Sequence, residues 1–200
     1  MSKGIVISII TGILAGFFFL TDAYLGIVDI AVTCTLMLLA ITVGIDFGMQ
    51  DNLVSEIIKE GPGLLLIPIA MIIGSLIMGA CTALILPYNL GETLAVSAGL
   101  GWYSLVPAML LKYSTELSAV SFLHNVLRET LGIILIPVVA KKLGFMESLS
   151  LPGAGCMDVC LPIIRRSTTP KIAVYAFVTG VLLTLTIPVI LTAIMNIFLV

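Results

Sequence analysis

Charged side chains are scarce in this chain, and that scarcity excludes a soluble domain. Only 10% of its 200 residues are charged, whereas 60% are hydrophobic. Soluble globular domains contain about 25% charged and about 45–50% apolar residues. The net charge of −2 is small, so it gives no reason to expect a nucleic acid as a partner. The composition indicates an integral membrane protein embedded in a lipid bilayer.

Histidine and cysteine are also few, which argues against a metal centre or a disulfide scaffold. The chain contains 1 histidine, His124, and 4 cysteines. The cysteines are Cys34, Cys81, Cys156 and Cys160, and no pair shows the spacing of metal ligands or of a redox motif. Zinc sites use several histidine or cysteine ligands. We therefore expect no metal and no cofactor, and we interpret the cysteines as small apolar residues.

Long apolar runs, in contrast, occupy most of the chain. A helix needs about 20 predominantly apolar residues to cross a bilayer, and the runs here predict about five transmembrane helices. They cover Gly4–Leu20, Leu25–Ile45, Leu64–Leu86, Leu117–Ala140 and Ile172–Phe198. We therefore expect an all-α integral membrane protein in which residues 1–200 form a single transmembrane domain.

Two further apolar stretches are interrupted at their centres by glycine pairs. Residues 92–111 contain the pattern G-x-G-x-x-S, which begins at Gly99, and residues 151–164 contain G-x-G-x-x-D, which begins at Gly153. Non-helical backbone at membrane depth is tolerated only where protein or water covers it. Paired, interrupted segments of this kind are typical of transporter binding sites. Their likeness predicts two broken or re-entrant segments, which an inverted repeat would explain.

The basic residues predict how the first broken stretch is placed. Lysine and arginine gather in loops on the cytoplasmic side of a membrane. If residues 92–111 crossed the membrane, Lys141 and Lys142 would lie outside, against this rule. If the stretch instead forms a re-entrant hairpin from outside, these lysines lie inside together with Arg165 and Arg166. The two broken tips then meet near mid-membrane from opposite faces. A single kinked spanning helix is the alternative.

The fourth apolar run carries Arg128 and Glu129 at its centre. A charge at the centre of a spanning helix costs about 2.5–3.5 kcal/mol, so such residues usually mark a pathway. On a helix, Asn125, Glu129 and Gly132 share one face, which we expect to be the wet side. His124 lies about 100° from that face, which favours a structural hydrogen bond over a proton relay. The alternative is that Arg128 and Glu129 lie near a membrane interface.

These features predict a site for an amino group, a carboxylate or a proton. Glu129 would bind an amine or a proton, and Asp158 would be a second carboxylate or, alternatively, a helix N-cap. Tyr103 and Ser104 would line the opposite tip, and Asn125 would hydrogen-bond a neighbour or the ligand. The other candidates are the basic neighbour of the central acid, the tip glycines and an acid at the end of the second run: Arg128, Gly99, Gly101, Gly153, Gly155 and Asp46.

Three motifs, Gly99–Leu105, Phe122–Glu129 and Gly153–Pro162, together resemble the LysO-type lysine exporter family. The resemblance implies a multi-pass protein that exports L-lysine and toxic lysine analogues from the cytoplasm across the inner membrane. It also implies that Glu129 matches an acidic residue that the family requires. Full-length members carry an additional N-terminal part with further spans. The resemblance thus suggests a split transporter completed by a separate small membrane protein, or a homo-oligomer.

The leading hypothesis is a secondary exporter that exchanges lysine for protons, because the sequence has no ATP-binding motif. One alternative is a non-transporting membrane subunit that assembles with a small partner, and another is a transporter of a different small solute or ion. A membrane-embedded enzyme that uses His124 or Asp158 is disfavoured, because the chain has no second histidine to complete a usual metal site. We therefore predict a transporter and not an enzyme.

Overall fold

The structure is a computed structural model that describes residues 61–199 continuously and scattered residues between Ile7 and Ile45. The chain divides into two compact units, Met1–Ser55 and Glu56–Val200. The described residues of the first unit are helical. Most residues of the first two predicted spans, and the candidate Asp46, lie outside the described residues. A single transporter domain over the whole chain stays a prediction.

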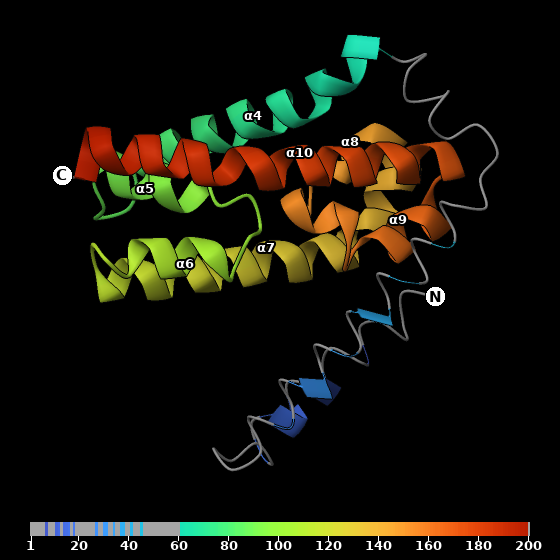
Figure 1. Cartoon of the computed structure of the whole chain (residues 1–200), viewed down its shortest axis with the longest axis horizontal. Coiled ribbons are helices and arrows are strands. Elements are labelled where there is room, and N and C mark those ends of the chain that lie inside the picture. The colour runs from blue at the N-terminus through green and yellow to red at the C-terminus, as the bar shows by residue number, and fades with distance from the viewer. Residues whose placement is uncertain are drawn as a thin grey trace. The chain divides into compact units, whose positions relative to one another are not determined.

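Within residues 61–199, three helices are long and apolar enough to cross a membrane. They are α4 (Leu66–Thr82), which continues a short 3-10 helix η2 (Gly61–Leu65), then α7 (Thr115–Lys142), and α10 (Pro170–Ile194), which ends in a π-helical turn η4 (Met195–Leu199). This part of the chain contains no strand. The predicted all-α membrane fold is confirmed, and each of the three helices coincides with a predicted span (Figure 1).

Polar residues cap the first turns of α7 and α10. The Ser114 side chain accepts a hydrogen bond from the Leu117 N–H at 3.3 Å, and Thr169 accepts one from Ile172 at 3.4 Å.

Around α7, the buried side is the expected polar face, which includes Asn125 and Glu129. The opposite face exposes large apolar side chains, as lipid contact requires. These exposed side chains include Phe122, Leu123, Leu127 and Leu131.

The first broken stretch forms a re-entrant hairpin, as predicted. Its arms are α5 (Leu90–Ser97) and α6 (Leu105–Leu110), which run back along each other in Figure 1. Tyr88, before the first arm, donates a hydrogen bond at 2.9 Å to the carboxylate of Glu116 in the first turn of α7. Because this bond joins the two ends of the hairpin, the chain between them leaves and returns at the same end of the bundle. The alternative of a kinked spanning helix is wrong.

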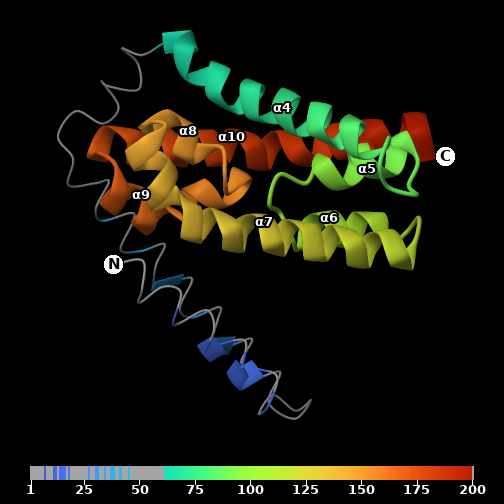
Figure 2. The same cartoon turned by 180° about the vertical axis from the view of Figure 1, so that it is seen from behind.

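The second broken stretch enters from the end at which α7 finishes. It comprises α8 (Phe145–Leu149), the 3-10 turn η3 (Gly153–Met157) and α9 (Leu161–Ser167). Figures 1 and 2 show this hairpin beside α7 and α10, with its tip turned toward the tip of the first hairpin. The Ala154 N–H donates a hydrogen bond to the Leu100 carbonyl at 2.8 Å, so the two tips touch. The predicted meeting of the tips is confirmed.

Candidate functional site

The two hairpin tips meet backbone to backbone, and glycine makes that approach possible. Gly101 has a φ of +94° and Gly153 a φ of +67°, a backbone region that favours glycine. A Cβ atom on Gly153 would collide with the Leu100 carbonyl, and one on Gly101 would collide with the Pro152 carbonyl. The predicted tip glycines therefore allow the contact between the hairpins, and each is matched to a backbone carbonyl on the other side.

Asn125 on α7 holds the first tip in place. Its side-chain oxygen accepts a hydrogen bond from the Gly101 N–H at 2.8 Å, and its amide nitrogen donates to the Ser121 carbonyl at 2.8 Å. The side chain is fully buried. A Cβ atom on Gly99 would lie 2.7 Å from the Asn125 amide nitrogen, so glycine is needed here for close packing. The prediction that Asn125 hydrogen-bonds a neighbour is confirmed, and the neighbour is the tip backbone.

Glu129 lies one turn further along α7 and faces the second tip. The residue is only 8% exposed. One carboxylate oxygen would lie 3.4 Å from a Cβ atom built on Gly155, so a larger side chain there would crowd it. No residue that the structure describes donates a hydrogen bond to this carboxylate. A buried carboxylate without a protein partner is costly, which makes it a natural site for a cation or a proton.

Asp158 follows the second tip and adds a second negative charge. It lies three residues beyond Gly155, the tip residue that the Glu129 carboxylate faces. The side chain is exposed, and it accepts a hydrogen bond from the adjacent Val159 N–H at 2.6 Å. It does not cap α9, whose N-cap residue is Cys160. The N-cap interpretation is therefore wrong, and Asp158 as a second carboxylate of the site stays a prediction.

Tyr103 and Ser104 lie at the end of the first tip, where they were expected. The Tyr103 ring packs edge-on against Phe122 with the ring centroids 6.4 Å apart. The Ser104 hydroxyl accepts a hydrogen bond from the Trp102 indole N–H at 3.1 Å. Tyr103 thus packs against α7, and Ser104 is bonded within its own tip. As residues that line the ligand site, both stay predictions.

Arg128 points away from the carboxylates and ties three segments together. Its guanidinium donates to the Ser75 hydroxyl at 3.0 Å, to the Ser150 carbonyl at 3.2 Å and to the Leu151 carbonyl at 3.2 Å. The two carbonyls follow the end of α8, where a helix leaves its last acceptors unpaired. Arg128 thus connects α7 to α4 and to the second hairpin. As a substrate ligand it stays a prediction.

Several residues that sequence reasoning missed hold the second tip against α10. The Cys156 thiol donates to the Ala176 carbonyl at 3.0 Å. Met157 packs against Gly180 in the space that a Cβ atom on Gly180 would occupy. Close by on α10, the buried Thr179 hydroxyl has no hydrogen-bond partner among the described residues. Small residues on a predicted span were the available signal, since they allow close packing between helices. Within the described residues no group of acidic, histidine or cysteine side chains could hold a metal ion.

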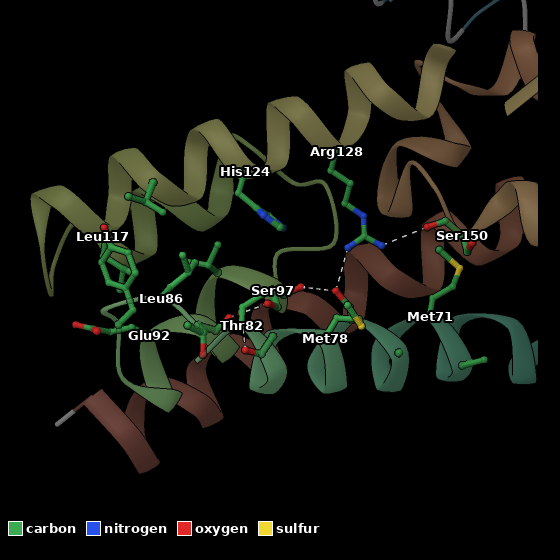
Figure 3. A pocket seen from close by; sticks show the side chains of 18 residues that line it. Met71, Met78, Thr82, Leu86, Glu92, Ser97, Leu117, His124, Arg128 and Ser150 are labelled. Carbon is green, nitrogen blue, oxygen red and sulfur yellow. Dashed lines mark hydrogen bonds between the residues drawn. The ribbon is translucent and has the colours of Figure 1, made fainter. Parts of the chain in front are cut away.

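His124 does not behave as predicted. Its ring makes no hydrogen bond to any residue between 61 and 199 and is exposed, so the expected structural hydrogen bond is absent. The side chain turns instead into a cavity between α4, α5 and α7, on the side of α7 where Arg128 also lies (Figure 3). Helical periodicity correctly predicted that His124 lies outside the face that carries Glu129. It could not predict that a cavity separates this part of α7 from α4.

Fold and site together define a multi-pass helical membrane protein with two opposed re-entrant hairpins that meet at an acidic centre. The model of the lysine exporter LysO family matches residues 6–195, and the chain belongs to this family. The resemblance seen in the three motifs is thereby confirmed.

Curated relatives carry the same family name. The chain is 30% identical over 158 residues to the lysine exporter LysO of Escherichia coli (strain K12), a match that covers 78% of this chain and 52% of that protein. It is also 30% identical over 152 residues to a Haemophilus influenzae protein named "Putative lysine exporter", which covers 74% of this chain and 77% of that protein. The chain thus spans about half the length of the Escherichia coli relative. No solved structure matches it.

Proposed function

We propose that this chain carries L-lysine and lysine analogues out of the cell across the inner membrane in exchange for protons. The observation that carries this proposal is the Glu129 carboxylate, buried in a spanning helix, without a donor among the described residues, and facing the joined hairpin tips. The family names of the relatives supply the substrate, and the site's chemistry fits it.

The pair of carboxylates suits a cationic amino acid. Asp158 follows the tip that Glu129 faces, so an ammonium group between the two carboxylates would be attracted by both negative charges. A proton would bind the same Glu129 carboxylate. Because one carboxylate cannot hold both a proton and an ammonium group, binding one favours release of the other. Such competition at a single group is the simplest basis for exchange transport.

A further subunit belongs to this proposal. The partner would be a separate small membrane protein, or a second copy of this chain. Co-purification of tagged and untagged chains would test the second copy. Lysine transport by the reconstituted chain, with and without a small partner, would separate a self-sufficient exporter from a non-transporting subunit.

Replacement of the central acid tests the proposed function. In cells loaded with a lysine dipeptide, Glu129→Gln should lower lysine efflux about tenfold or more, because a loss of about 1.4 kcal/mol in binding already changes occupancy tenfold. The matched control is Glu116→Gln on the same helix, where the acid is exposed and accepts, among the described residues, a hydrogen bond from Tyr88 alone, which glutamine can also accept. Undiminished efflux in Glu129→Gln, with normal protein levels, would refute the site.

A further inference from the structure

A second feature of the structure is a cavity of about 620 Å³ between α4, α5 and α7. Its volume lies within the range of about 300–1,000 Å³ that is usual for small-molecule sites. Figure 3 shows it running beside α7, from Leu117 near the start of that helix to Arg128 near its middle. Arg128 is eleven residues beyond Leu117, so the cavity is about 16 Å long along the helix axis, which is about half the thickness of the hydrocarbon core of a membrane.

The walls of the cavity are apolar, with polar groups at particular depths. Met71, Met78 and Val120 supply apolar surface, while His124 and Arg128 reach it from α7. Gly74 on α4 contributes open space, since a Cβ atom built on it would meet nothing within 4 Å. A long aliphatic chain with charged ends matches such a lining better than a purely apolar molecule does, because His124 and Arg128 would otherwise face hydrocarbon.

A bridge of side chains lies on the wall of the cavity, beside the middle of α7. The Arg128 guanidinium donates to the Ser75 hydroxyl at 3.0 Å, and that hydroxyl donates to the Ser97 carbonyl at 2.8 Å (Figure 3). Arg128 also holds the Leu151 carbonyl, two residues before the second tip begins at Gly153. Glu129 is the next residue on α7. The bridge is therefore next to the carboxylate site along α7, and its hydrogen bonds are ones that side-chain rotation can break.

The charges of the described residues indicate which face this cavity opens toward. Lys141 and Lys142 end α7, Arg165 and Arg166 end α9, and Lys171 begins α10, so all five lie at one end of the bundle. At the opposite end, in the described part of the chain, only the loop after α6 carries a basic residue, Lys112. The positive-inside rule places the basic end in the cytoplasm. Along α7 the lining runs from the start of the helix to its middle and thus lies in the external half, while along α4 it reaches further inward, to Ala70.

We propose that this cavity is the external vestibule through which lysine leaves the Glu129 site, an inference that rests on the proposed function. The aliphatic chain of lysine lies along the apolar walls, and its carboxylate is bound by the His124 ring and, when the bridge opens, by Arg128. His124 is suited to this role because it is exposed and makes no hydrogen bond to any described residue. The Arg128–Ser75 bridge lies on the wall of this vestibule, one residue from Glu129 along α7.

Thiol labelling tests the vestibule without requiring transport. In a background with Cys34→Ala and Cys81→Ala, since these are the exposed cysteines among the described residues, Gly74→Cys should react with a charged, membrane-impermeant thiol reagent added outside. Millimolar lysine should slow that reaction severalfold. The matched control is Ile73→Cys, the neighbouring position on α4, which is 53% exposed and does not line the cavity. Equal inertness of both cysteines would mean that lipid fills the cavity, and labelling that lysine does not slow would mean that lysine does not bind there. Either result would overturn the proposal.

A cavity-filling variant supplies the transport readout. Gly74→Trp should fill open space and lower lysine efflux about tenfold, whereas Ile73→Trp should leave efflux and thermal stability near those of the original chain. If Glu129→Gln abolishes efflux while Gly74→Trp does not, the proposed function stands and the vestibule is refuted. If Gly74→Cys is protected by lysine but Glu129→Gln exports normally, the vestibule stands and the carboxylate site is refuted.

Discussion

At the scale of single residues, the glycines of this chain fall into two physically different groups. Gly101 and Gly153 have a positive φ, and a backbone carbonyl of the other hairpin lies where a Cβ atom would be. Each of these two features alone favours glycine. Gly74 has neither constraint, and its side is open. The G-x-G pattern thus predicted the broken segments correctly, because glycine is what the contact between their tips requires. The pattern itself could not reveal that each tip glycine faces a carbonyl of the other hairpin.

The difference between these glycines predicts the outcome of a matched pair of alanine variants. Gly153→Ala should destabilise the protein by at least about 1–2 kcal/mol, since an L-residue is strained in the left-handed region and its Cβ atom collides with the Leu100 carbonyl. Gly74→Ala should change stability little. Thermal unfolding in detergent measures both. Equal unfolding temperatures for the two variants would contradict the tip geometry.

At the scale of elements, Arg128 explains how α4 and the second hairpin stay in register with α7. One guanidinium joins Ser75 of α4 to the two carbonyls after α8. The sequence pointed to Arg128 as an unusual residue at membrane depth, but its partners lie 53, 23 and 22 positions away, and two of them are backbone carbonyls. Sequence reasoning identifies the ionisable residue and not the acceptors, because a carbonyl becomes available only where a helix ends.

Removal of this guanidinium should loosen three elements together. Arg128→Met leaves the Ser150 and Leu151 carbonyls without their donor, at about 1–3 kcal/mol for each unsatisfied group. Each kcal/mol corresponds to about 2–4 °C for a chain of this size. The control is Arg166→Met, in which an exposed arginine in the last turn of α9 is replaced. A melting temperature for Arg128→Met that equals that of the control would show that the Arg128 hydrogen bonds contribute nothing to stability.

The broken elements themselves were predictable, whereas their contacts were not. Glycine pairs and the positions of Lys141 and Arg165 were enough to predict two hairpins from opposite faces. The Glu129 face followed from helical periodicity, as did the packing role of Asn125. The role of His124 could not be derived, because a residue 100° from the buried face either packs or lines a cavity according to where α4 lies, and α4 is far away in sequence. Asp46 lies outside the described residues.

At the scale of the whole molecule, the described basic residues and the two hairpins give one consistent orientation. The loop residue Tyr113 lies between α6 and α7, and Leu143 follows the last turn of α7. Both side chains are exposed, at 43% and 72%. Because α7 crosses between them, they belong to opposite sides of the membrane, and the basic residues assign Leu143 to the cytoplasm.

Single cysteines at exposed loop positions test this orientation and the hairpin at once. In the Cys34→Ala and Cys81→Ala background, Leu84→Cys and Tyr113→Cys should both react with an impermeant reagent in intact cells. Leu143→Cys should react only after the membrane is opened. Because residues 84 and 113 flank the first hairpin, their labelling from the same side is the signature of re-entry. Labelling of Leu84→Cys and Tyr113→Cys from different sides would restore the kinked spanning helix.

The hydrogen bond from Ala154 to the Leu100 carbonyl restricts how the two sides of the membrane can be opened in turn. Both atoms belong to the backbone, so the bond does not depend on which side chains stand at these positions, provided that residue 154 is not proline. A rearrangement that keeps the bond must carry both hairpins as one body while the long helices tilt around them. A rearrangement that breaks it must supply water to a freed amide and a freed carbonyl. In the first case the joined tips are a fixed pivot for the moving helices, and not a pair of independently swinging gates.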